Sequence, residues 1–152
     1  MEHDRTLSAV FPVLLRQNGG TEQILLHRRS NTGYMDGRWD IAASGHVDRG
    51  ETATEALARE CREEIGITVR PEDAVFIHLC HSVERSGRKT YYNLYFRVKA
   101  YTGTPVIMEP EKSAALEWFD VSRLPEDMIP ARKRDLLLAL AGRTYSESLQ
   151  AE

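Results

Sequence analysis

The sequence is poor in cysteine and contains no long apolar run. Two of the 152 residues are cysteines, Cys61 and Cys80, and both lie within apolar patterns. No disulfide framework is indicated, and a reduced, cytoplasmic setting is expected. No apolar stretch approaches the roughly 20 residues needed to cross a bilayer, and the segment MEHDRTLSAVFPVLL lacks the layout of a signal peptide. These absences favour a soluble protein that has no membrane partner.

Blocks of like charge are also missing. The chain carries 20 basic and 23 acidic side chains, mixed along its length, and has a formal net charge of −3. Because no basic stripe is present, long nucleic acid is not the expected partner. With 41% hydrophobic and 28% charged residues among 152, the composition is that of one globular domain spanning residues 1–152.

Strand-like patterns outnumber helical ones. Apolar or alternating runs of strand length occur at residues 7–15, 23–27, 74–83, 90–98 and 114–119. Ser86-Gly87 lies between two long runs and predicts a hairpin. Helical patterns occupy residues 52–65 and the segment ARKRDLLLALAG that follows Pro130. We expect an α/β (α+β) fold with a mixed sheet between helices, and a frayed tail at residues 143–152.

The first helical segment has defined boundaries. Thr52 and Glu55 form a capping-box pattern at its start, and Gly66 is a C-cap at its end. At 100° per residue, its apolar positions gather on one face. This predicted core face consists of Ala53, Leu57, Ala58, Cys61 and Ile65.

Three carboxylates, Glu60, Glu63 and Glu64, share a stripe that borders this core face. A solvated charged face is one interpretation, but opposite charges are missing from the stripe. Like charges at this spacing repel and raise one another's pKa unless a cation neutralises them. Mg²⁺ or Mn²⁺ is suited to such oxygen ligands, and Glu51 adds a fourth carboxylate just before the helix.

The residues before and within this helix resemble the Nudix box, Gx5Ex7REUxEExGU, in which U is a bulky apolar residue. Its fixed positions are occupied by Gly45, Glu51, Arg59, Glu60, Glu63, Glu64, Gly66 and Ile67. Cys61 stands where the family usually has Ile, Leu or Val, and it is expected to pack as a small apolar residue. The resemblance implies a Nudix-type α/β/α sandwich with a mixed sheet, a Nudix helix after a glycine-containing loop, and a C-terminal helix.

The resemblance also implies Mg²⁺-dependent hydrolysis, with Mn²⁺ as the alternative cofactor, of a nucleoside diphosphate linked to another group. On the matching positions, Glu60, Glu63 and Glu64 would be metal ligands, joined by the backbone carbonyl of Ser44 or Gly45. Metal ions at a phosphoanhydride neutralise charge on its oxygens and make bound water more acidic.

Other roles follow from the same resemblance. Glu60 is the first candidate for the base that deprotonates the attacking water, and Glu63 is the second. Arg59 would orient these carboxylates by ion pairing, and Glu51 and Gly66 would support the site. Relatives often take a further acidic ligand from the loop before the last strand. In this chain Glu111 fits that position, with Glu109 as the alternative.

Candidates for substrate contact lie outside the box. Tyr34, Met35, Trp39, Tyr91 and Tyr95 could stack on a base, although aromatic residues in strands usually belong to the core. Asn93 is a stronger candidate, because an inward-facing amide needs hydrogen-bond partners. His78 and His81 alternate with apolar residues and are expected to be structural rather than catalytic.

The segment LEWFDVSRLPEDMIPARKRDLLLAL is similar to the last strand and final helix of the MutT-like group, which hydrolyses nucleoside triphosphates. Specialists for oxidised purines tend to have Asp or Asn just after the proline, whereas Pro130 is followed by Ala131, Arg132 and Lys133. This departure argues against 8-oxo-purine selectivity. Arg132 is expected to contact substrate phosphate or to cover the start of the helix.

The leading hypothesis is a pyrophosphohydrolase that converts a nucleoside triphosphate to a nucleoside monophosphate and pyrophosphate. An isopentenyl-diphosphate isomerase-like enzyme is an alternative, because WDIAASGHVDRGE has a faint likeness to that group. The cysteine and glutamate pair expected of the isomerase is not evident. A non-catalytic nucleotide-sensing module is a third possibility. The expected partner is a small nucleotide, and the pattern is compatible with a monomer or a homodimer.

Overall fold

The computed structural model describes residues 2–85 and 89–150. Its central sheet has the strand order β5-β1-β7-β6-β9. The β1–β7 and β6–β9 pairs are parallel, and the β5–β1 and β7–β6 pairs are antiparallel. The bounds of these strands are β1 Thr6–Val13, β5 Gly45–His46, β6 Ala74–Glu84, β7 Lys89–Val98 and β9 Tyr145–Gln150. The sheet is therefore mixed, as predicted.

A second, antiparallel sheet is built around β3. Strands β2 and β4 pair with successive parts of one edge of β3, and β8 pairs with the other edge. The bounds of these strands are β2 Leu15–Asn18, β3 Thr21–Arg29, β4 Trp39–Ile41 and β8 Ser113–Asp120. Two short 3₁₀ helices, Pro71–Asp73 and Val121–Arg123, connect elements of the fold.

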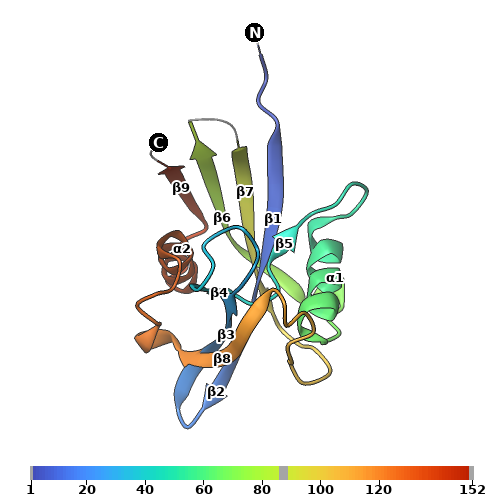
Figure 1. Cartoon of the computed structure of the whole chain (residues 1–152), viewed down its shortest axis with the longest axis vertical. Coiled ribbons are helices and arrows are strands. Elements are labelled where there is room, and N and C mark those ends of the chain that lie inside the picture. Colours follow the sequence, from blue (N-terminus) through green and yellow to red (C-terminus); the bar gives the residue numbers. More distant parts are fainter. Residues whose placement is uncertain (1, 86–88, 151–152) are drawn as a thin grey trace.

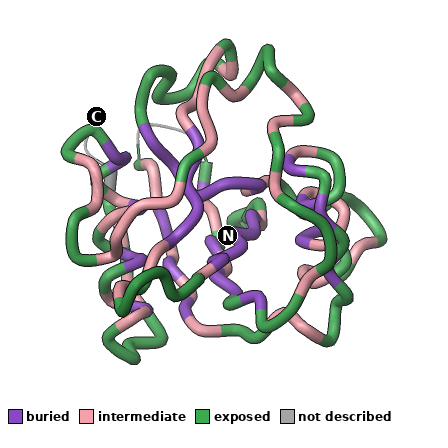
Figure 2. Tube along the Cα trace, turned by 90° about the horizontal axis from the view of Figure 1, so that it is seen from below, coloured by how far each residue is buried: buried purple, intermediate pink, exposed green. Residues whose placement is uncertain are grey.

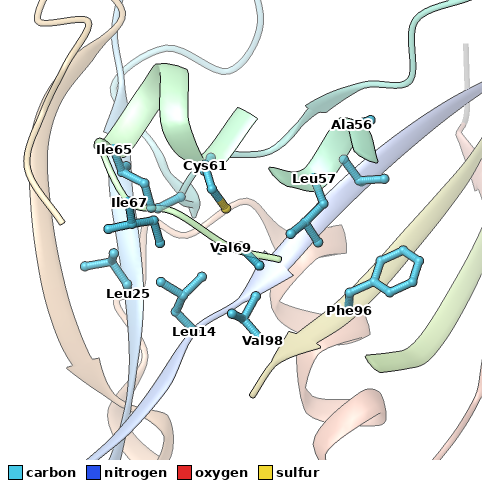
Figure 3. Close-up of a cluster of buried hydrophobic side chains, with 13 residues drawn as sticks. Leu14, Leu25, Ala56, Leu57, Cys61, Ile65, Ile67, Val69, Phe96 and Val98 are labelled. Carbon is cyan, nitrogen blue, oxygen red and sulfur yellow. The ribbon is translucent and has the colours of Figure 1, made fainter. Parts of the chain in front are cut away.

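Helices α1 (Ala53–Ile65) and α2 (Pro130–Leu140) lie on opposite sides of the central sheet (Figure 1). Strand alternation explains this arrangement, because successive side chains of β1 point to opposite faces. Val10 packs in one buried cluster with α1, whereas Phe11 packs in a second cluster with Leu136 of α2. Figure 3 shows the first cluster. Figure 2 shows that the buried segments lie in the middle of the molecule. The predicted α+β sandwich is confirmed.

The caps of α1 form as the sequence predicts. The Thr52 hydroxyl accepts from the backbone N–H of Glu55, and the Glu55 carboxylate accepts from the N–H of Thr52. Gly66 has a φ of 69°, the left-handed conformation that glycine adopts without a steric penalty. Cys61 lies on the core face of α1 and is fully buried, as expected for its place in the motif. The start and end of α1 are therefore fixed locally.

The prediction of a frayed tail at residues 143–152 is wrong for most of that segment. Residues 145–150 form β9, which pairs with β6 from Leu79 to Glu84. The segment is polar, so its side chains gave no strand signal, but its backbone hydrogen bonds to β6 do not depend on apolar side chains. Buried His78 also holds it, through contacts of 2.8 Å to the Arg143 carbonyl and 2.8 Å to the Ser146 hydroxyl.

The hairpin predicted at Ser86-Gly87 lies outside the described residues, although Glu84 of β6 and Lys89 of β7 pair on either side of it. Within residues 2–85 and 89–150, neither helix has the length and apolar character of a membrane-spanning segment.

Candidate active site

The structure contains a cleft of about 940 Å³ whose lining comes from α1, the loop before it, β3, β7 and α2. Its two ends differ in chemistry. We call the end that contains Glu60, Glu63 and Glu64 the acidic end, and the end that contains Arg132 and Asn93 the guanidinium end. The predicted metal ligands and two of the predicted substrate contacts thus share one cleft.

The backbone of the loop before α1 lies directly against Glu60. A Cβ atom added to Gly45 would lie 2.5 Å from Oε1 and 2.8 Å from Oε2 of the Glu60 carboxyl group. No side chain larger than hydrogen fits there without displacing the carboxylate. Ala43, two residues earlier, has a φ of 62°, a conformation that is costly for a residue with a Cβ. The loop is therefore held in a strained path that brings backbone to the acidic end.

Arg59 connects the acidic side chains to this loop. Its guanidinium donates two hydrogen bonds to the Glu51 carboxylate, at 2.7 and 3.0 Å. It also donates to Glu60 at 2.7 Å, to Glu63 at 3.3 Å and to the backbone carbonyl of His46 at 3.0 Å. Because a guanidinium is planar and always charged, these contacts fix the direction in which each acceptor points.

Glu60 and Glu64 form a buried carboxyl pair. Burial raises the pKa of Glu64 to about 9, and the neighbouring carboxylate of Glu60 adds to this rise. Burial also raises the pKa of Glu60, although hydrogen bonding and attraction from Arg59 oppose it. Without a cation, the pair therefore retains a proton at neutral pH. A second positive charge beside them would favour the fully ionised state.

The loop before β8 brings another acidic side chain to this end. The backbone N–H groups of Val106 and Met108 donate to the carbonyls of Ile65 and Glu64, at 3.0 and 3.1 Å, so the loop is fixed on the end of α1. Glu109 lines the cleft close enough to Glu64 to raise its pKa further.

Of the two acidic residues predicted from this loop, the alternative, Glu109, lines the cleft, and Glu111 does not. Glu111 is exposed and does not line the cleft. Its backbone carbonyl instead accepts a hydrogen bond from Asn31 at 3.1 Å. The two-residue difference matters because the loop turns between them, with the backbone N–H groups of Lys112 and Ser113 donating to the Glu109 carbonyl.

The donor set at the acidic end fits a hard divalent cation. Its side chains offer carboxylate oxygens, and burial keeps part of their charge suppressed until a cation compensates it. Among the residues that the structure describes, no three acidic, histidine or cysteine side chains already converge in a metal-binding arrangement. Glu60 and Glu63 are instead ion-paired with Arg59, at 2.7 and 3.3 Å.

At the guanidinium end, Asp40 is the residue that the sequence did not reveal. Its carboxylate is 1% exposed and accepts from Arg29 at 3.1 Å and from Arg132 at 3.0 Å. Arg132 also lies over the ring of Phe11, 4.3 Å from the ring centre. Arg132 is therefore held by β4 and β1, rather than covering the helix start as a solvated side chain. The signal available in the sequence was a charged residue inside the apolar run Trp39 to Ile41.

The aromatic candidates divide between cleft and core. Tyr34 lines the cleft and is 43% exposed, and Asn93 lines it while only 7% exposed. Tyr91 also lines the cleft, where its hydroxyl lies 3.1 Å from His46 Nε2. Trp39, the other predicted substrate contact, lies in the core and not in the cleft lining. It is 5% exposed and packs edge-to-face on Phe119 in the second core cluster, away from the cleft lining.

Four other residues considered from the sequence lie outside the cleft lining: Tyr95, Met35, His78 and His81. Tyr95 is fully buried in the core, where its hydroxyl donates to Asp135 at 2.9 Å. His78 is structural, as predicted, since both ring nitrogens have partners in the 143–146 segment. His27 was not anticipated. It lines the cleft 3.1 Å from the Ser113 hydroxyl, and burial lowers its pKa.

Comparison with known proteins agrees with this geometry. The family model of the NUDIX domain matches residues 6–140. The chain is 30% identical over 126 residues to a putative 8-oxo-dGTP diphosphatase of Bacillus subtilis (strain 168), covering 83% of this chain and 74% of that protein. It is 28% identical over 139 residues to putative nudix hydrolase 1 of Caenorhabditis elegans, covering 89% of this chain. It spans only 34% of the length of that second relative.

Among solved structures, the crystal structure of a MutT NUDIX hydrolase from Burkholderia pseudomallei has the same fold. The two align with a TM-score of 0.75 at 24% sequence identity, covering 93% of this chain and 100% of the other. At this identity the likeness concerns the fold alone.

Proposed function

Because the chain belongs to the Nudix family and is a hydrolase of diphosphate bonds, we propose that it is a Mg²⁺-dependent nucleoside triphosphate pyrophosphohydrolase. Its products would be a nucleoside monophosphate and pyrophosphate. The observation that carries the proposal is the acidic end of the cleft. There, Glu60, Glu63 and Glu64 line the cleft together. Glu60 lies against Gly45, and Arg59 orients Glu60 and Glu63 by hydrogen bonds.

The residues that would hold the cation are Glu60, Glu63 and Glu64, with Glu109 from the loop and the backbone carbonyl of Ser44 or Gly45. When bound, Mg²⁺, or Mn²⁺ in its place, supplies charge neutralisation at the phosphate oxygens and lowers the pKa of bound water. This chemistry suits the donor set, since phosphoanhydride cleavage requires both effects.

The protein side chains have separate tasks in this proposal. Glu60 takes the proton from the attacking water, with Glu63 as the second candidate. Arg59 is a positioning residue, because its hydrogen bonds to Glu60 and to Glu51 fix the carboxylate of Glu60 relative to the loop. Glu51 in turn accepts from the backbone N–H of Asp48 at 2.9 Å, which ties this network to the loop.

The size of the cleft and a relative's name support a nucleotide substrate. A volume of about 940 Å³ is in the range of small-molecule sites. The Bacillus subtilis relative is described as a putative 8-oxo-dGTP diphosphatase, an activity on a nucleoside triphosphate. Mg²⁺ or Mn²⁺ is the proposed cofactor. We also propose a cytoplasmic location, in keeping with the two free cysteines, and a monomer or homodimer.

The test is turnover of a substrate panel with Mg²⁺, measured as release of inorganic phosphate and pyrophosphate. The panel contains NTPs, dNTPs, oxidised dNTPs, ADP-ribose, NADH, nucleotide sugars and isopentenyl diphosphate. Pyrophosphate release from nucleoside triphosphates, lost in Glu64→Gln, is the expected result. Glu111→Gln is the matched control on the exposed part of the β8 loop, and it should retain activity. Turnover confined to another class, or none at all, would overturn the proposal.

A further inference from the structure

The floor of the guanidinium end is a row of side chains across the central sheet. Ala9 of β1 is in register with Asn93 of β7, and Asn93 is in register with Cys80 of β6. All three line the cleft. Because Ala9 and Cys80 are small, the row leaves a flat surface on either side of the Asn93 amide.

The rows on either side of this floor are bulkier. Phe11 and Tyr95 stack in the next row toward α2, with ring centres 4.9 Å apart, and Arg132 lies over Phe11. The row on the other side contains Tyr91, whose hydroxyl lies 3.1 Å from Nε2 of His46, the β5 residue in register with Ala9. Rows that share a face are about 7 Å apart along a strand, so the floor has the width of a flat ring.

The two ends belong to one cleft but to different faces of the central sheet. Gly45, which lies against Glu60, is paired with Val10 on the face that α1 covers, whereas Asn93 is in register with Ala9 on the other face. Strand β5 has β1 as its sheet neighbour and lies at the edge of the sheet, so the cleft is able to pass from one face to the other there. A nucleotide with its diphosphate at the acidic end therefore has its base free to reach the floor around that edge.

Arg132 lies beside this floor and has hydrogen-bond donors to spare. It is 8% exposed and lines the cleft. A guanidinium has five N–H groups and no acceptor. One N–H goes to Asp40, and the Tyr95 hydroxyl lies close enough to take another. At least three N–H groups are left for a bound molecule.

Asn93 is a second polar side chain of this end. The residue is 7% exposed and lines the cleft, and its side-chain amide forms no hydrogen bond within residues 2–85 and 89–150. The amide is therefore available to a molecule in the cleft. Since an amide has both donors and an acceptor, Asn93 is able to pair with a mixed edge, whereas Arg132 is able to pair only with acceptors.

Phosphate is a poorer occupant of this end than a neutral polar ring. Arg132 is ion-paired with Asp40, a carboxylate that it shares with Arg29, and the carboxylate of Asp135 lines the same end. Both carboxylates are 1% exposed, and they would repel a dianion at short range.

We infer that Arg132 and Asn93 select a base whose edge presents two adjacent acceptors. Guanine has this edge at O6 and N7, and cytosine has it at O2 and N3; a guanidinium fork matches such a pair. In 8-oxoguanine, N7 carries a proton, so one acceptor becomes a donor that faces the Arg132 donors. Adenine and thymine each place a donor next to an acceptor on the corresponding edges. The inference rests on the proposed function and adds base selectivity to it.

The first test is kcat/KM of the wild-type protein for dGTP, dCTP, dATP, dTTP and 8-oxo-dGTP with Mg²⁺. We expect dGTP and dCTP to be preferred by about 10-fold or more, since one well-made bidentate contact discriminates by that order. Arg132→Gln should remove most of this preference, because a glutamine amide accepts as well as donates. Lys133→Gln, on the neighbouring position outside the cleft lining, should retain it.

A binding measurement separates this inference from the proposed function. Titration calorimetry with dGMP, dCMP, dAMP and 8-oxo-dGMP, which contain no phosphoanhydride, reports base preference even in a protein that cleaves none of the triphosphates. Tighter binding of dGMP and dCMP supports the inference whatever the outcome of the hydrolysis panel. Equal affinity for all bases, or preference for the 8-oxo nucleotides, overturns it. Both wild-type measurements remain decisive if Arg132→Gln does not fold.

Discussion

The two ends of the cleft are built in different ways. At the acidic end, the hydrogen bonds of Arg59 to Glu51, Glu60, Glu63 and the His46 carbonyl span at most 13 positions in the sequence, and the more distant β8 loop adds Glu109. At the guanidinium end, Arg132 reaches Asp40 across 92 positions. A site made of local contacts leaves a fixed spacing in the sequence, whereas a site made by tertiary packing does not.

The comparison makes a prediction about kinetics. Substitutions at the acidic end should act on the chemical step, because those side chains meet the diphosphate. Substitutions at the guanidinium end should act on which nucleotide binds. The following three substitutions test that division, in order of decreasing expected effect.

Glu60→Gln at the acidic end is expected to have the largest effect. Loss of a general base typically lowers kcat by about 10²–10⁴-fold, and the amide also has one fewer charge for a metal ion. Steady-state kinetics with the best triphosphate of the panel measures this, and KM should change far less than kcat. A fall in kcat of less than 10-fold would transfer the role of base to Glu63.

Asp40→Asn at the guanidinium end should act mainly on stability. The change places an amide donor beside Arg29 or Arg132, and breaking a buried ion pair costs about 3–5 kcal/mol. Urea unfolding of the wild-type and variant proteins would measure this loss. At a temperature where the variant is folded, its kcat for a triphosphate should stay within a few-fold of wild type. A collapse of kcat in the folded variant would show that the two ends are not separable.

Gly45→Ala tests the contact between the loop and Glu60. The added methyl group overlaps the carboxylate, and overpacking of this kind costs about 1–3 kcal/mol. Combining it with Glu60→Ala should recover most of that loss, because the atoms that clash are then absent. A double-mutant cycle in thermal unfolding measures the coupling between the two positions. Additive losses would mean that Gly45 is needed for another reason.

The sequence was informative wherever the structure depends on neighbouring residues. The caps at Thr52 and Gly66, the core face of α1 and the acidic stripe could all be read from spacing, because helical geometry relates positions three and four apart. The choice between Glu109 and Glu111 could not, because it depends on where the loop docks on the end of α1.

The errors share a physical cause. Trp39 was assigned to the cleft from its residue type, but its position was decided by β3 and by Phe119, which belong to other parts of the chain. Strand β9 was missed because its side chains are mostly polar and give no apolar pattern, although its backbone pairs with β6. Hydrophobic periodicity and composition indicate which secondary structure a segment prefers. The segments that pack against it decide which of its side chains are buried.

The last experiment concerns the stability of the metal-free protein as a function of pH. Burial raises the pKa of Glu64 from an ordinary value of 4.5 to about 9. Between these values the folded state holds a proton that the unfolded state has released, so stability must fall as the pH rises. We expect the melting temperature to fall from pH 5 to pH 9, and Glu64→Gln to flatten that slope.

The same melting temperatures are then measured with Mg²⁺ present. At pH 8 the cation should raise the melting temperature of the wild-type protein, because it favours the ionised carboxylates and binds the folded state. It should raise that of Glu64→Gln much less, whereas Glu111→Gln should behave as wild type does. An equal pH slope in the wild-type and Glu64→Gln proteins would mean that another group dominates. In that case the burial of Glu64 beside Glu60 would not destabilise the folded protein, and the acidic end would not differ in this respect from the ion-paired carboxylate of Asp40.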